Sequence, residues 1–106
     1  GSIGDTVISK NTMIDNLVHI AHNVKIGENS IIAAMTGISG STEIGKNAMI
    51  GGQVGISGHV KIGDNVKIAA KSGIMKDISS NSNIGGYPAE NIIDWHRGTI
   101  FLRKNR

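Results

Sequence analysis

Isoleucine recurs every six residues along the first three quarters of the chain. The twelve positions follow one another without exception, at Ile8, Ile14, Ile20, Ile26, Ile32, Ile38, Ile44, Ile50, Ile56, Ile62, Ile68 and Ile74. The residue two places before each isoleucine is small or β-branched, and ten of the twelve residues that follow isoleucine are Gly, Ala or Ser. Three aligned columns of this length define an internal repeat, and a repeat of this kind determines the fold class.

A period of six fits neither an α-helix nor a simple alternating hairpin strand. It fits a short strand in which the isoleucine and the residue two places before it face the same side, followed by a turn at the small residue. Asn23, Asn29, Asn47 and Asn65 lie beside the expected turns, and asparagine tolerates left-handed backbone conformations. The pattern therefore predicts an all-β solenoid of parallel strands, with coils stacked about 4.8 Å apart.

The repeat resembles the known hexapeptide-repeat solenoids, in which three six-residue edges form one triangular coil. Twelve hexads would then give four coils. The resemblance also implies left-handed winding, which the pattern alone would not predict because parallel crossovers are usually right-handed. The expected fold is thus a left-handed parallel β-helix, here over residues 1–76.

The repeat is predicted to end near Met75, and residues 77–88 are expected to form a loop. Residues 89–106 are predicted to form a C-terminal α-helix and tail, because Pro88 suits a helix start. One face of that helix would carry Ile92, Trp95, Thr99 and Leu102.

Composition narrows the function classes. The single Phe, Tyr and Trp all lie at position 87 or later, so the predicted interior is narrow and aliphatic. The chain has no cysteine, which excludes disulfide and thiolate chemistry. Its longest apolar runs are too short to span a bilayer and no signal segment opens the sequence, so a cytoplasmic protein is expected. The net charge of +3 is small, and we expect no nucleic-acid partner.

Three polar residues are candidates for catalysis. Asp15 places a carboxylate in the column that is otherwise almost entirely Gly, Ala or Ser. His22 follows it by seven residues, which would put both around one corner region, where an acid could orient an imidazole that acts as a general base. His59 follows His22 by two coils plus one residue, near the same edge and about 10 Å along the axis. The plainer interpretation is a turn-stabilising aspartate and solvated histidines.

A metal site is a further alternative, because some hexapeptide β-helices bind zinc between subunits through three histidines. His22 and His59 would be ligands together with His19, which we expect to point outward as a surface or interface residue. The spacing lacks the pair of histidines, five residues apart, that is typical of γ-class carbonic anhydrases. We therefore predict no metal.

The motifs are more specific than the hexad pattern. The run from Ile14 to Asn29, the segment Gly40-Ser41-Thr42 and the run from Met49 to His59 together resemble the UDP-3-O-acylglucosamine N-acyltransferases of lipid A biosynthesis. The resemblance covers nearly the whole chain. It implies transfer of a 3-hydroxyacyl chain from the 4'-phosphopantetheine thioester of acyl carrier protein to the 2-amine of a UDP-sugar, in a homotrimer, with no permanently bound cofactor.

The same resemblance assigns roles to residues. His22 would be the general base, Asp15 would orient it, and His59 would position the thioester or its developing oxyanion. Four residues would contact substrate or the carrier arm: Asn23, Lys76, Gly86 and Tyr87.

The family also has an N-terminal uridine-binding domain, for which this chain has no counterpart. We therefore expect the 106 residues alone to assemble but to have little activity. The alternatives are a coenzyme A-dependent sugar N-acetyltransferase and a non-catalytic structural β-helix.

Overall fold

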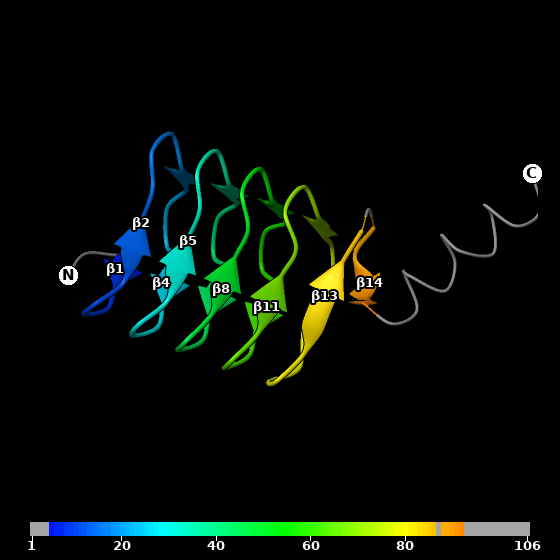
Figure 1. Cartoon of the computed structure of the whole chain (residues 1–106). Helices are drawn as coiled ribbons and strands as arrows, with labels where there is room; N and C mark the ends of the chain where they lie inside the picture. Colours follow the sequence, from blue (N-terminus) through cyan, green and yellow to red (C-terminus); the bar gives the residue numbers. More distant parts are fainter. Residues whose placement is uncertain (1–4, 87, 93–106) are drawn as a thin grey trace, which may run out of the picture.

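The computed structural model describes residues 5–86 and 88–92, and each isoleucine of the repeat ends a two-residue strand. The strands form three sheets, one on each side of a triangular coil (Figure 1). Sheet A contains β1 (Val7–Ile8), β4 (Lys25–Ile26), β7 (Glu43–Ile44) and β10 (Lys61–Ile62). Sheet B contains β2 (Met13–Ile14), β5 (Ile31–Ile32), β8 (Met49–Ile50), β11 (Lys67–Ile68), β13 (Asn83–Gly85) and β14 (Glu90–Asn91). Sheet C contains β3 (His19–Ile20), β6 (Gly37–Ile38), β9 (Gly55–Ile56) and β12 (Gly73–Ile74).

Strands of consecutive coils pair in parallel with a register of eighteen residues. In sheet A, for example, Ile26 lies between Ile8 and Ile44. The first twelve strands therefore make four coils, which confirms the prediction from the twelve hexads. Since each of these twelve strands has only two residues, the fold depends on the stacking of coils rather than on the length of any strand.

The interior is filled by the two columns that the sequence predicts. From Val24 onward, every isoleucine of the repeat and every residue two places before it is buried. Buried hydroxyl groups within the stack are satisfied because they donate to backbone carbonyls. Thr36 donates to Gly51 O of the next coil at 3.0 Å, and Thr42 donates to Ser57 O of the next coil at 2.9 Å. A threonine can thus replace valine in this column without leaving a buried polar group unpaired.

The corners have a uniform backbone. The third residue after each of the first eleven isoleucines has φ between 56° and 63°, in the left-handed region. Asn23, Asn29, Asn47 and Asn65 all occupy this position, as the sequence predicts. Where the residue directly after isoleucine is glycine, close approach of the coils is the reason: a Cβ atom on Gly27 would lie 2.5 Å from backbone atoms of Gly45 and Lys46.

The segment predicted to be a loop continues the solenoid instead. Ile78 pairs with Ile62, and β13 pairs with β11, so Ile78 and Ile84 are both buried at the end of the core. The prediction of a loop failed because the corner after Ile74 is two residues shorter than the others. The deletion interrupts the six-residue pattern in the sequence while the coil closes as before.

The sequence predicts a C-terminal helix from residue 89 onward, and this predicted start is too early. Glu90–Asn91 form strand β14, antiparallel to β13, where the sequence predicts the first turn of a helix. The extended backbone here completes the edge of sheet B next to β13. The predicted helical face from Trp95 onward lies outside the described residues. Among residues 5–86 and 88–92, no helix is long and apolar enough to cross a membrane.

Candidate functional site

His22 lies in the turn between β3 and β4, where sheet C gives way to sheet A. The same turn in the next two coils contains Gly40 and then Gly58, each eighteen residues further along. A Cβ atom built on Gly40 would lie 3.2 Å from both Cε1 and Nε2 of His22, so the imidazole packs directly against the Gly40 backbone. The side chain of His22 is otherwise exposed. We call these three turns, residues 21–24, 39–42 and 57–60, the histidine corner.

His59 belongs to the same corner, two coils further along the axis. It stands in a column with Asn23 and Ser41, and all three have left-handed backbone conformations, with φ of 58°, 61° and 60°. Asn23 Nδ2 donates to Ser41 Oγ at 3.2 Å, and the His59 backbone N–H donates to Gly40 O at 3.1 Å. The predicted placement of His22 and His59 at one edge is confirmed. The two exposed imidazoles and the Asn23 amide therefore share one surface, separated by a strip with little side-chain bulk.

Asp15 lies elsewhere in the chain. It stands in the corner between β2 and β3, and its Oδ1 accepts a hydrogen bond from the Asn16 backbone N–H at 2.7 Å. Since β3 separates this corner from His22, the prediction that Asp15 and His22 adjoin one corner is wrong within a single chain. Seven residues span a whole side of the triangle, from one corner to the next. This contact matches the plainer interpretation of a turn-stabilising aspartate.

The remaining predicted contacts lie toward the C-terminal end. Lys76 continues the column of His22, Gly40 and Gly58 in sequence, but it stands in the shortened corner, where it lines a small hollow of about 310 Å³ together with Met75 and Pro88. Gly86 has φ of 98° and its carbonyl accepts a hydrogen bond from the Gly73 N–H at 2.9 Å. Tyr87 lies outside the described residues.

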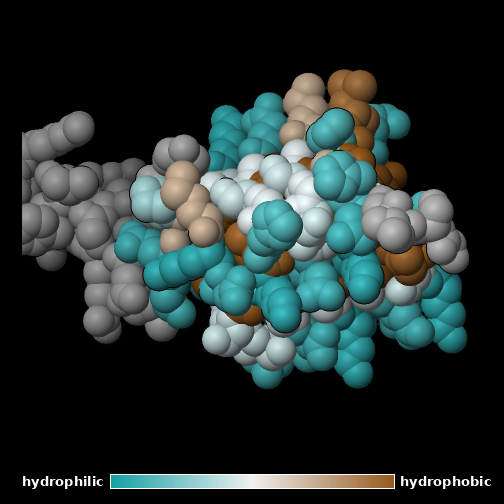
Figure 2. Space-filling model, turned by 180° about the vertical axis from the view of Figure 1, so that it is seen from behind, coloured by the Kyte–Doolittle hydropathy of each residue, from teal (hydrophilic) through white to brown (hydrophobic). Residues whose placement is uncertain are grey.

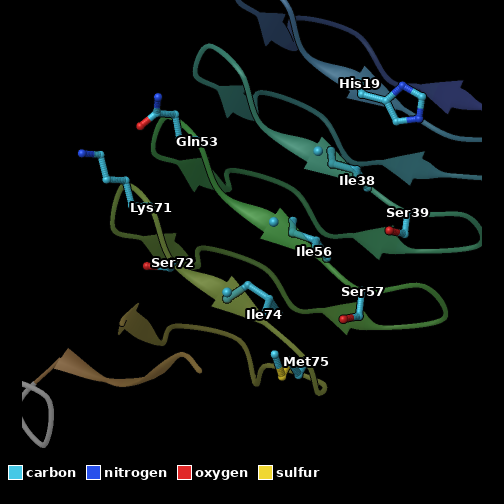
Figure 3. A pocket seen from close by; sticks show the side chains of 13 residues that line it. His19, Ile38, Ser39, Gln53, Ile56, Ser57, Lys71, Ser72, Ile74 and Met75 are labelled. Atoms are coloured by element: carbon cyan, nitrogen blue, oxygen red, sulfur yellow. The ribbon is translucent and has the colours of Figure 1, made fainter. Parts of the chain in front are cut away.

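The structure also shows a hollow that the motifs do not indicate. His19, exposed as predicted, heads the outward column of sheet C, and the next three members of that column are Gly37, Gly55 and Gly73. Cβ atoms on Gly37 and Gly55 would meet nothing within 4 Å. The result is a hollow of about 490 Å³ (Figure 3), with Gln53 and Lys71 on one side and Ser39 and Ser57 on the other. Ser39 and Ser57 belong to the histidine corner, so the hollow opens beside it.

Glycine at eighteen-residue spacing, directly before isoleucine, is the sequence signal that reveals this hollow. It is visible at positions 37, 55 and 73. Among the described residues, no group of three or more His, Cys, Asp or Glu side chains is arranged to hold a metal ion.

Hydrophobic side chains are exposed on a different part of the surface. Met13, Ile31 and Met49 stack on the outside of sheet B, and Leu17 and Met35 stack on the adjoining corner. We call these five residues the apolar face. Leu17 is 78% exposed and Met13 is 66% exposed, which is unusual for large apolar side chains that neighbour one another. The face drawn in Figure 2 likewise has hydrophobic residues along its upper edge and near the N-terminal end.

Comparison with known proteins agrees with this fold. The model of the bacterial transferase hexapeptide family, described as six repeats, matches residues 5–40 and 41–76. The chain belongs to this family. Its coils are those of a left-handed parallel β-helix, which confirms the solenoid predicted from the repeat and the handedness implied by the resemblance.

Two curated relatives have the same name. The chain is 53% identical over 104 residues to UDP-3-O-acylglucosamine N-acyltransferase from Caulobacter vibrioides and 56% identical over 104 residues to the enzyme of that name from Rickettsia bellii. Each match covers 98% of the chain, but the chain spans only 31% and 30% of the length of these relatives.

Solved structures with the same coils include other acyltransferases. UDP-N-acetylglucosamine O-acyltransferase from Moraxella catarrhalis matches with a TM-score of 0.80 and 29% identity, over 88% of the chain and 38% of that protein. Soybean serine acetyltransferase matches with a TM-score of 0.76 and 26% identity, over 82% of the chain and 40% of that protein.

Proposed function

We propose that this chain is the β-helical part of an acyltransferase of lipid A biosynthesis. The enzyme would transfer a 3-hydroxyacyl group from acyl carrier protein to the 2-amine of UDP-3-O-acylglucosamine. The observation that carries the proposal is the identity of 53–56% over 98% of the chain to relatives with this name. The exposed histidine corner supports it, because amide formation from an amine needs a base at an accessible surface.

In the proposed reaction His22 accepts a proton from the attacking amine. The amine nitrogen bonds to the thioester carbonyl carbon, and the carbonyl oxygen takes up negative charge. The carbon–sulfur bond then breaks, and the proton held by His22 passes to the departing pantetheine thiolate. The products are an amide and the free thiol of the carrier. No further reactant is needed in this proposed reaction.

His59, two coils from His22, would act on the donor rather than on the amine. Its distance along the axis, about 10 Å at the usual strand spacing, suits contact with an extended pantetheine arm or with the developing oxyanion. Asn23, beside His22, would bind the acceptor. Lys76 and the Gly86–Tyr87 segment would contact the carrier arm beyond the fourth coil. The hollow over Gly37, Gly55 and Gly73 lies beside the same corner, and these three glycines place no side chain in it.

We further propose that the active enzyme is a homotrimer that buries the apolar face. Burial of apolar surface contributes roughly 25 cal/mol per Å², so five exposed large side chains on one side of the solenoid favour association. Asp15 borders this face, since it lies two residues before Leu17. Because Asp15 cannot reach His22 across β3, its proposed orienting role would act on His22 of a neighbouring copy.

The test uses a chimera in which this chain replaces the matching 104-residue segment of the Caulobacter enzyme. We expect acyl transfer from 3-hydroxyacyl carrier protein, and a loss of at least about 100-fold in kcat for His22→Ala. Glu28→Ala is the matched control, because Glu28 has the same place in the next corner of the coil and is exposed. A folded chimera without transfer, or full activity of the His22→Ala variant, would contradict the proposal.

The likeness to soybean serine acetyltransferase supports a second candidate, an acetyltransferase that uses coenzyme A. The same chimera separates the two. Transfer from acetyl-coenzyme A but not from the acyl carrier protein thioester would favour the second candidate.

A further inference from the structure

Gly40 is the residue that touches the imidazole of His22. All three atoms nearest to a Cβ on Gly40 belong to His22: Cε1 and Nε2 at 3.2 Å and the backbone O at 3.5 Å. Two of them are atoms of the ring that would accept the proton. The contact crosses from one coil to the next, because Gly40 follows His22 by eighteen residues.

The backbone does not require glycine at this position. Gly40 is not among the residues with positive φ. The equivalent position, two residues after isoleucine, is occupied elsewhere by large residues, such as Glu28, Lys46 and Asp64. A side chain is therefore compatible with this place in the turn. What distinguishes Gly40 is the ring beside it.

Neither Gly27 nor Gly52 lies against a histidine ring. At Gly27 a Cβ would meet backbone atoms at 2.5 Å, so the coil spacing excludes a side chain there. At Gly52, the equivalent of Gly40 in another corner, a Cβ would meet only Ala34 O, at 3.3 Å. Ala34 and Ala70 occupy the Gly52 column in the neighbouring coils, so a methyl group is tolerated in that column.

We infer that Gly40 is a positioning residue for His22: its missing side chain leaves the space in which the imidazole rests against the next coil. A methyl group at position 40 would force the ring to move by a few tenths of an ångström, since the ring is exposed and the coil backbone is held on both sides by its ladder. Proton transfer depends on geometry at this scale, and a displacement of about 1 Å can cost about 100-fold in rate. The inference rests on the proposed role of His22.

The experiment compares Gly40→Ala with Gly52→Ala in the Caulobacter chimera. Both variants add one methyl group at the same place in a turn, but only the first faces His22. We expect Gly40→Ala to lower kcat roughly 10-fold, to change KM less than about twofold, and to shift the pH dependence of kcat. With histidine labelled with ¹³C at Cε1, the NMR signal of His22 is identified as the one that is missing from the spectrum of the His22→Ala variant. We expect this signal to be displaced in Gly40→Ala and unchanged in Gly52→Ala.

Equal kcat in the two variants with an unmoved His22 signal would overturn the inference. A thermal midpoint for Gly40→Ala well below that of Gly52→Ala would also overturn it, because the coil rather than the ring would then be absorbing the methyl group. The labelled signal separates this inference from the proposed function. A displaced signal in an enzyme that does not need His22 would confirm the contact and refute the catalytic role.

Discussion

The coil spacing at the sheet A corner predicts a large difference between two chemically identical substitutions. In Gly27→Ala the new Cβ would lie 2.5 Å from Gly45 C and from Lys46 N, both backbone atoms. Neither atom can rotate away, so consecutive coils must separate locally. That movement strains the ladder bond from Gly27 N to Ile44 O, now 2.8 Å. In Gly52→Ala the closest contact is 3.3 Å, which small shifts relieve.

The magnitude follows from two costs. Overpacking of a well-packed interior costs about 1–3 kcal/mol, and a weakened backbone hydrogen bond adds about 1 kcal/mol. For a domain of this size 1 kcal/mol corresponds to roughly 4–8 °C in thermal midpoint. Gly27→Ala should therefore lower the midpoint by at least about 10 °C, whereas Gly52→Ala should stay within a few degrees of the parent chain. Thermal unfolding followed by circular dichroism measures both. Equal midpoints would refute the argument from coil spacing.

Three further predictions concern the core, the assembly and the site. Ile38→Ala removes a fully buried side chain in the middle of the stack and should cost about 2–5 kcal/mol, measured by denaturant unfolding, whereas Glu28→Ala should cost less than about 0.5 kcal/mol. Leu17→Glu places a charge in the apolar face and should convert the proposed trimer to monomers, as measured by light scattering after size exclusion; an unchanged mass would exclude this face from the interface. Trimers that mix Asp15→Asn chains with His22→Ala chains should regain activity that neither variant has alone, because each mixed trimer would contain one interface with an unaltered Asp15 and an unaltered His22. Failure to regain activity would refute a role for Asp15 across chains.

The solenoid was predictable because its determinants are local. The isoleucine column, the small or β-branched column and the asparagines at turns each report on a single hexad, and the structure confirms what each implies for burial and backbone. The continuation through Ile78 and β13 was not predictable from that pattern, since a corner shortened by two residues breaks the period without ending the coil. Strand β14 was missed for a related reason: its backbone is extended because β13 offers an edge, whereas Pro88 and the apolar spacing favour a helix.

The sequence pattern predicts the location of the histidine corner but not the side-chain contacts within it. Spacing placed His22 and His59 at one edge correctly, since eighteen residues return the chain to the same corner. The contact between His22 and Gly40 depends on the orientation of a side chain, which spacing does not determine. Its only trace in the sequence is a glycine at a position where the next corner of the coil carries charged residues, Glu28, Lys46 and Asp64.

Asp15 shows how the geometry of the triangle constrains the chemistry. An offset of seven residues is one hexad plus one, and one hexad is one side of the coil, so the two residues flank β3 instead of meeting. None of the twelve residues of the histidine corner is acidic. The same corner of the preceding coil carries a carboxylate, Asp5, which stands eighteen residues before Asn23. Two acids are therefore candidates to orient the imidazole: Asp5 of the same chain, and Asp15 of a neighbouring copy, which borders the apolar face by which copies would associate.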